Sequence, residues 1–177
     1  DTSNQPAAPL GAPLGTSTCA TYKRACAFGV DPEIRGAVAF IVMTDDGVPF
    51  DGAALDRGPL GGAETAFASL AFALAARGHQ VAVRNNCETR ETCRGVDWAP
   101  LRADLPEACD LYIANRGDKL LPLAPNARSR VFWIHNPAGY LLKWRYLWKL
   151  WRFRPAIVFS GAYHAGTLPK WVPSGRR

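Results

Sequence analysis

The apolar positions of this chain fall into short runs separated by polar and turn-forming residues. Five runs have the length and composition of β-strands, and they are AVAFIVM (37–43), QVAVRN (80–85), DLYIAN (110–115), RVFWIHN (130–136) and AIVFS (156–160). The first run is apolar throughout, which is typical of a parallel strand buried on both faces. Residues 63–77 show a helical period instead, with one buried face formed by Phe67, Leu70, Ala71 and Leu74.

The order of these elements predicts a parallel α/β architecture. Strand, helix and strand follow one another between residues 37 and 85, as in a right-handed βαβ unit. We therefore expect one Rossmann-like domain over residues 36–177, with a parallel sheet flanked by helices. Gly78 follows the predicted helix, where a left-handed residue commonly ends one. Residues 163–171 suggest a short closing helix.

Residues 1–35 have a different composition. They are rich in Pro, Ala, Gly, Ser and Thr and show no sustained apolar period. This composition predicts a poorly ordered N-terminal arm or leader.

Charge is distributed unevenly along the chain. Residues 1–110 hold 9 Lys and Arg against 14 Asp and Glu, whereas residues 111–177 hold 12 Lys and Arg against the single Asp118. A basic half of this kind predicts an anionic partner, which includes phosphate, nucleic acid and an acidic membrane surface. No apolar run approaches the ~20 residues needed to span a bilayer.

The five cysteines leave two interpretations open. Their spacing does not fit a zinc knuckle, and no histidine lies near them at a suitable distance in sequence. A disulfide between Cys87 and Cys93 is one interpretation. Free thiols in a reducing cytoplasm are the other, which the odd number of cysteines favours.

The stretch PLGGAETAF (59–67) places two glycines directly before the predicted helix. Since ligands of parallel α/β domains bind outside the carboxyl ends of the strands, Gly61 and Gly62 are expected at the ligand-binding edge. Backbone amides at a helix N-terminus suit a phosphate. A purely structural turn is the alternative, because neither G-x-G-x-x-G nor a Walker sequence is present.

A longer pattern around these glycines is more specific. RGPLGGAETAFASLAFALAARGHQVAV resembles the N-terminal signature of the retaining glycosyltransferases of family four, in the GT-B superfamily. That signature combines Gly-Gly-x-Glu, a helix with a Leu-Ala pair, an Arg-Gly-His turn and a Val-rich strand. The resemblance covers residues 37–172 and implies the N-terminal Rossmann-like half of a GT-B fold.

The resemblance implies roles for individual residues. Gly61 and Gly62 would contact the diphosphate of a nucleotide-sugar donor, and His135 would be the catalytic residue, beside the transferring sugar and the acceptor. A hydrogen-bonded structural histidine is the alternative for His135. We expect no metal and no cofactor, because an Asp-x-Asp motif is absent and helix N-termini can stabilise the leaving diphosphate.

Three further residues are candidate substrate contacts. Asn136 follows His135 and would either donate to the ligand or cap the turn. Arg116 would pair with a phosphate, or form a surface ion pair with Asp118. Glu64 lies in the first turn of the helix, where the dipole favours a negative charge, and that structural role is preferred.

The segment LLKWRYLWKLWRFRP (141–155) interleaves aromatic and basic residues. Trp suits a membrane interface and Lys or Arg suits anionic headgroups, so peripheral membrane contact is one interpretation. A partly buried helix that covers the sheet is the other. No nucleic-acid motif accompanies the segment, which disfavours nucleic acid as a partner. The candidate membrane contacts are Trp144, Trp148, Trp151, Lys149 and Arg152.

The resemblance implies the acceptor-side domain of a bacterial, metal-independent hexosyltransferase. Its partners would be a nucleotide-sugar donor and a glycan or lipid-linked acceptor, in the cytoplasm or at the inner face of the membrane. The resemblance implies a second, nucleotide-sugar-binding domain that this sequence does not contain, so we expect the chain alone to be inactive. A stand-alone, non-catalytic α/β binding or interaction module is the alternative.

Overall fold

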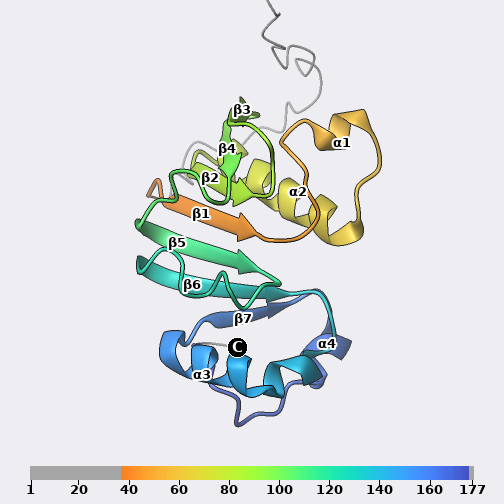
Figure 1. Ribbon diagram of the computed structural model, residues 1–177, viewed down its shortest axis with the longest axis vertical. Coiled ribbons are helices and arrows are strands. Elements are labelled where there is room, and N and C mark those ends of the chain that lie inside the picture. Colours follow the sequence, from red (N-terminus) through yellow and green to blue (C-terminus); the bar gives the residue numbers. More distant parts are fainter. Residues whose placement is uncertain (1–36, 176–177) are drawn as a thin grey trace, which may run out of the picture.

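The computed structural model describes residues 37–175, so the predicted arm of residues 1–35 lies outside the described residues. The elements follow one another as β1 (Phe40–Asp45), α1 (Ala54–Arg57), α2 (Gly62–Ala76), β2 (Gln80–Asn85), β3 (Glu91–Cys93), β4 (Val96–Pro100), β5 (Ala108–Asn115), β6 (Asn126–Ile134), the 3-10 helix η1 (Ala138–Leu142), α3 (Trp144–Phe153), β7 (Ala156–Phe159) and α4 (Ala162–Gly166) (Figure 1).

Within the described residues, the strands form one seven-stranded sheet in the order β3-β4-β2-β1-β5-β6-β7. All pairs are parallel except β3 with β4. The predicted Rossmann-like α/β class is therefore confirmed. The five predicted strands are all present, although β1 begins three residues after the start of the predicted run and ends two residues beyond its end.

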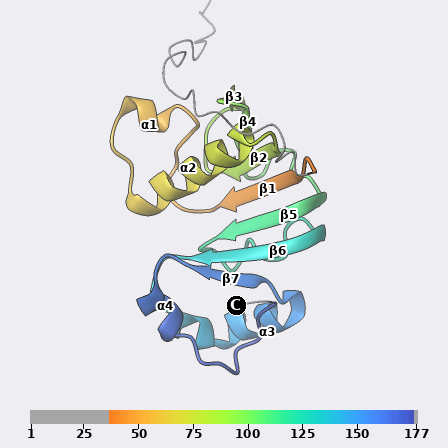
Figure 2. The ribbon, with the colours of Figure 1, turned by 180° about the vertical axis from the view of Figure 1, so that it is seen from behind.

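Helices cover both faces of the sheet. Side chains alternate along β1, so that Ile41 and Met43 face the core beneath α2, while Val42 faces the core beneath η1 and α3. Figures 1 and 2 show α2 beside the β1, β2 and β4 half of the sheet and α3 beside the β6 and β7 half. A core on each face requires strands that are apolar throughout, which explains the continuous apolar run of β1.

The helical prediction is confirmed in extent and partly wrong in its buried face. Phe67 and Ala71 are buried as predicted, but Leu70 and Leu74 lie at the edge of the core. Glu64 and Ala68 are buried in their place. Gly78 has φ = 89°, the left-handed conformation predicted at the end of this helix.

Two strands, one α-helix and the 3-10 helix η1 were not predicted. The hairpin of β3 and β4 contains only three and five residues, and α1 is a single turn inside the loop after β1. Elements of this length show too few positions for an apolar period to appear. The three described cysteines, Cys87, Cys93 and Cys109, are free thiols, so the alternative of a Cys87–Cys93 disulfide is wrong.

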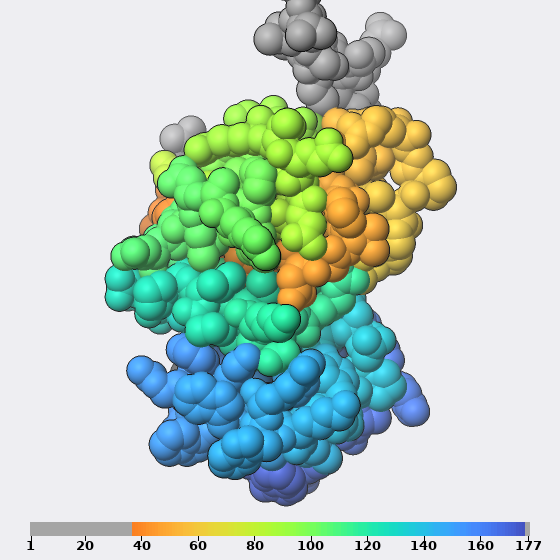
Figure 3. Space-filling model, viewed as in Figure 1, coloured from red at the N-terminus to blue at the C-terminus, as the bar shows by residue number. Residues whose placement is uncertain are grey.

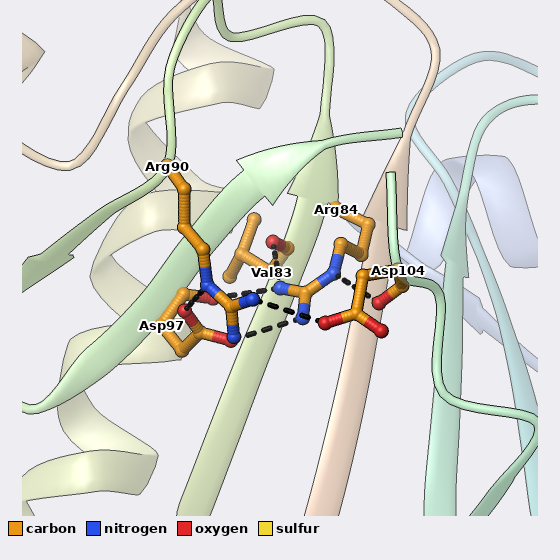
Figure 4. A network of polar contacts seen from close by, with 5 residues as sticks. All are labelled: Val83, Arg84, Arg90, Asp97 and Asp104. Carbon is orange, nitrogen blue, oxygen red and sulfur yellow. Dashed lines mark hydrogen bonds and ion pairs between the residues drawn. The ribbon is translucent and has the colours of Figure 1, made fainter. Parts of the chain in front are cut away.

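A buried arginine connects β2 to the unpredicted hairpin (Figure 4). The side chain of Arg84 is 2% exposed and donates to the carboxylate of Asp97 at 2.9 Å. It also donates to the backbone carbonyls of Val83, Asp97 and Asp104 at 2.9–3.1 Å. Arg90 donates to both carboxylate oxygens of Asp97 and to Asp104. These acceptors compensate the desolvation of the guanidinium group.

Replacing Asp97 by Asn is expected to lower the free energy of unfolding by about 1.5–3 kcal/mol at pH 7, the usual range for hydrogen bonds to charged groups. Partial burial raises the pKa of Asp97, but the hydrogen bonds from Arg90 and Arg84 outweigh it and the net pKa is lowered. The carboxylate therefore stabilises the fold above about pH 4, and this contribution disappears as the pH falls through the lowered pKa.

Urea unfolding of the wild type and of Asp97→Asn at pH 7 and at pH 3 measures the difference in their free energies of unfolding. The difference between wild type and Asp97→Asn should shrink at pH 3. Glu88→Gln, which neutralises an exposed acid, is the matched control and should change stability little at either pH. An Asp97→Asn difference that grew at pH 3 would contradict the assignment.

Candidate site at the carboxyl ends of the strands

The candidate site lies where the order of the strands reverses. From β1 the chain first adds β2 on one side and later β5 on the other, so the topological switch point falls between β1 and β5. Ligands of open α/β sheets bind in the crevice outside the carboxyl ends of the strands at this point. The register pairs Asp45 with Asn115 and Asn115 with Trp133, which brings the ends of β1, β5 and β6 together.

Arg116 connects three elements at this edge. Its guanidinium group donates to both carboxylate oxygens of Asp45, at 2.9 and 2.7 Å, and to Glu64 Oε1 at 2.8 Å. Asp45 is 1% exposed. A Cβ atom at Gly47 would lie 2.1 Å from Arg116 Nη2, so a larger residue there would force the guanidinium group to move. This cluster joins the end of β1, the first turn of α2 and the end of β5.

The predicted ion pair between Arg116 and Asp118 is wrong. Asp118 accepts from Lys149 Nζ at 2.7 Å and pairs with Arg145 at 3.3 Å, both of which lie on α3. Arg116 adopts φ = 63° directly after β5, and its side chain points to Asp45 and Glu64. Neighbours in sequence are therefore separated by the turn, and each finds its partner on a distant element.

Burial and pairing set the charge states of the cluster. Burial raises the pKa of Asp45 despite the hydrogen bonds from Arg116. Burial also acts to raise the pKa of Glu64, but its own backbone amide and Arg116 outweigh that effect and lower it. The carboxylate of Glu64 is thus bound to a backbone amide of the first turn and to Arg116, consistent with the preferred helix-stabilising role.

His135 is held by a buried amide. Its Nε2 lies 2.8 Å from Asn115 Oδ1, which only accepts hydrogen bonds, so Nε2 carries the hydrogen and Nδ1 of the neutral ring is an acceptor. Burial lowers the pKa of His135, and the charge of Arg116 lowers it further, while Glu64 acts in the opposite direction. The ring also packs against Trp133, with centroids 4.8 Å apart. His135 is therefore an oriented, neutral imidazole at physiological pH.

Asn115 has an unpaired donor. Its side chain is completely buried, and Nδ2 has no hydrogen-bond partner among residues 37–175. A buried amide donor without a partner costs free energy, so it marks a place where a further acceptor would be stabilised. Sequence reasoning identified Asn115 only as the end of a strand. Its place in the register, next to the strand that carries His135, is the signal that identifies it.

The two glycines of the loop differ in what the fold requires. A Cβ atom at Gly61 would lie 2.2 Å from Glu64 Oε2, whereas one at Gly62 would meet no atom within 4 Å. Both residues are exposed at the start of α2. A side chain at position 61 would therefore displace the Glu64 carboxylate, whereas a Cβ atom at position 62 would displace no atom of another part of the described chain.

A crevice of about 500 Å³ opens at the same edge of the sheet. Asp46 follows β1, Asn85 ends β2 and Lys119 follows β5, and all three line the crevice. Arg102, Asn86 and Cys87 also contribute. Sequence reasoning did not bring these residues together in a site, because they come from four separate connections that only the sheet order places side by side.

The predicted contact Asn136 and the other two histidines lie apart from this cluster or beside it. Asn136 is exposed and follows His135. His79 accepts from the amide of Ala39, before β1 begins and thus away from the carboxyl ends of the strands, consistent with a structural role. His164 is hydrogen-bonded to Ser160 at 3.0 Å. No group of three or more His, Cys, Asp or Glu side chains in the described part of the chain is arranged to hold a metal ion.

The aromatic and basic segment forms α3, and the structure separates its members. Trp144, Trp148 and Trp151 are exposed, as is Arg152. Lys149 instead points inward to Asp118. None of the helices within residues 37–175 has the length and apolar character needed to cross a membrane. One side of this helix therefore packs on the core, as the partly buried interpretation predicts, and the three tryptophans lie on its exposed side.

No family model, no curated protein and no solved structure matches this chain.

Proposed function

We propose that this chain is the acceptor-side domain of a retaining, metal-independent glycosyltransferase that uses a nucleotide-sugar donor. The observation that carries the proposal is the neutral His135, held by the buried Asn115 at the topological switch point of the sheet. The proposal is further supported by the Gly-Gly-x-Glu and Arg-Gly-His resemblance, whose glycines begin α2 at the same edge.

In this reaction the bond between the sugar C1 and the donor diphosphate breaks, and the acceptor oxygen bonds to C1 on the same face. The acceptor proton passes to the leaving diphosphate oxygen. His135 Nδ1 would accept a hydrogen bond from a sugar or acceptor hydroxyl, while Asn115 fixes the ring. Holding a reacting group in such a geometry lowers the barrier by reducing the entropy that must be lost.

The negative charge that develops on the diphosphate needs a positive counterpart. Arg116 is a poor source, because Asp45 and Glu64 already pair with its guanidinium group. The exposed backbone amides at the start of α2 can supply it, together with the dipole of that helix. We therefore assign Arg116 to positioning and the loop of Gly61 and Gly62 to the donor phosphates.

Donor cleavage tests the proposal directly. Protein from the complete reading frame would be incubated with UDP-, GDP-, ADP- and dTDP-hexoses, and the release of nucleoside diphosphate would be measured with and without EDTA. We expect one donor class to be cleaved at a rate that EDTA does not change. Binding without turnover would support the non-catalytic module instead, and the absence of both would refute a donor site.

Replacing Gly62 by Val is expected to weaken donor binding by about tenfold or more, equivalent to about 1.4 kcal/mol. A Cβ atom at this position would have no atom of another part of the described chain within 4 Å, so the added side chain is expected to obstruct a ligand and not the fold. Isothermal titration with the cleaved donor measures the affinity, and thermal unfolding checks the fold.

Gly58→Val is the matched control, because Gly58 lies in the same loop and its Cβ would also be unobstructed. It should leave donor affinity unchanged. Equal affinities of the Gly62 variant and wild type would refute the assignment of the loop to the donor phosphates.

A further inference from the structure

Four tryptophan side chains form an exposed apolar surface remote from α2. Trp144, Trp148 and Trp151 of α3 are 78%, 45% and 63% exposed, and Trp171 near the end of the described chain is 66% exposed. With Leu147 and Pro173 they line a groove of about 510 Å³. We call these four residues the tryptophan surface. Figure 3 shows the blue segment that contains α3 at the surface of the molecule, at the end away from α2.

The fold does not require these indoles. The inner side of α3 is already occupied by Tyr146 and Leu150, which are buried in the core. Lys149 anchors the helix to Asp118. Trp144, Trp148 and Trp151 follow one another four and three positions apart, so they share the opposite side of the helix. Large apolar patches left in water commonly mark an interaction surface.

The surroundings of the tryptophan surface are strongly basic. Residues 138–175 contain six Lys and Arg and no Asp or Glu. Lys143, Arg145 and Arg152 are exposed on or beside α3, and Lys170 is exposed next to Trp171. The only acid that neutralises this region in the described structure is Asp118, which is buried beneath α3. An occupant of this surface must therefore combine an apolar layer with negative charge.

We propose that the tryptophan surface docks on an anionic phospholipid membrane. Indole rings are enriched at the boundary between headgroups and acyl chains, and exposed Lys and Arg are attracted to the phosphates. The groove itself contains no charged side chain among its described lining residues, so apolar and basic groups are separated. A channel for single-stranded nucleic acid would instead place cations along the same groove as the aromatic rings. A second copy of the chain would bring two basic surfaces together.

Vesicle co-sedimentation tests the proposal with the full chain. Phosphatidylcholine vesicles and vesicles that contain 30% phosphatidylglycerol would be compared at low and high salt. We expect binding to the anionic vesicles, reduced by salt, together with a blue shift of tryptophan fluorescence as the indoles leave water. The double variant Trp144→Ala/Trp151→Ala should bind at least tenfold more weakly, with unchanged thermal unfolding, because both side chains are exposed.

Charge is tested with a matched pair of substitutions. Arg152→Glu should weaken binding to the anionic vesicles, whereas Arg77→Glu, the same charge change at the end of α2, should alter it much less. Equal binding of wild type and the tryptophan variant, or binding that is indifferent to phosphatidylglycerol, would overturn the proposal. Two other results for the tryptophan variant would also overturn it, if vesicle binding stayed unchanged. One is a loss of dimerisation measured by light scattering, and the other is a loss of oligonucleotide binding measured by fluorescence anisotropy.

Discussion

Replacing His135 by Ala in the complete protein is expected to lower kcat for sugar transfer by about 10²-fold or more. It should also lower the free energy of unfolding by about 1–3 kcal/mol, because the buried Asn115 Oδ1 loses its donor. The ring is half-buried and its orientation depends on the hydrogen bond to Asn115. Without the ring, the hydroxyl that Nδ1 would hold is free to leave the reactive geometry. Single-turnover release of nucleoside diphosphate at saturating donor measures the effect on the chemical step.

His79→Ala is the matched control for this substitution. His79 is also a partly buried histidine with one hydrogen bond, but it accepts from Ala39 at the amino end of β1. Its loss should cost some stability and leave kcat near the wild-type value. If His135→Ala retained wild-type turnover, or if the two variants lost the same activity, the catalytic assignment would be wrong.

The same histidine predicts the pH dependence of transfer. Burial and the charge of Arg116 lower the pKa of His135 below its ordinary value of 6.5. Because the neutral ring is the active form, kcat should be constant above that pH and decline only below it. An acid limb centred above pH 6.5 would contradict a neutral His135 at physiological pH.

Replacing Arg116 by Met should be the most destabilising of the substitutions considered, by about 3–5 kcal/mol at pH 7 to 8. Methionine keeps most of the length of the side chain and removes the charge, so the buried carboxylate of Asp45 loses its counterion. Glu64 loses its partner at the same time. Urea unfolding at several pH values measures the loss.

The sign of the pH effect distinguishes this cause from a general packing defect. Burial already raises the pKa of Asp45 in the native protein, and removing Arg116 would raise it further. A raised carboxyl pKa means that the folded state keeps its proton more readily, so stability falls as the pH rises through that range. The variant should therefore be impaired less at pH 5 than at pH 8.

Two comparisons complete this experiment. Adding Asp45→Asn to Arg116→Met removes the unpaired charge and should restore part of the lost stability. Arg57→Met breaks a similar pair, in which Nη2 contacts both carboxylate oxygens of Asp51, but that arginine is 60% exposed, so the loss should stay within about 1 kcal/mol. A loss at Arg116 no larger than the loss at Arg57 would show that the cluster does not carry the stability assigned to it.

Local pattern was sufficient to predict the main elements of this protein. Burial on a sheet with a core on each face produces apolar residues at regular positions along the sequence. This explains the apolar runs of β1, β2, β5, β6 and β7 and the helical period of α2. Gly78 was predictable for a similarly local reason, since its left-handed backbone follows the last turn of a helix. The placement of His135 at a strand end followed from the same pattern.

Contacts between distant elements do not produce a repeating pattern in the sequence. Arg116 was paired with Asp118 from sequence proximity, yet the turn after β5 directs the two side chains to α2 and α3. Lys149 was grouped with Trp148 because both residue types suit a membrane interface, although one points inward and the other outward. The role of Asn115 depends on register with β6, and the crevice depends on the order of the strands.

The sequence by itself thus determined which segments are buried and in what regular structure, because burial repeats along the chain with the period of the element. Only the tertiary structure decided which polar groups meet at the switch point and which indoles remain exposed. Such pairings depend on the direction of each side chain and on strand order, and residues far apart in sequence set both of these.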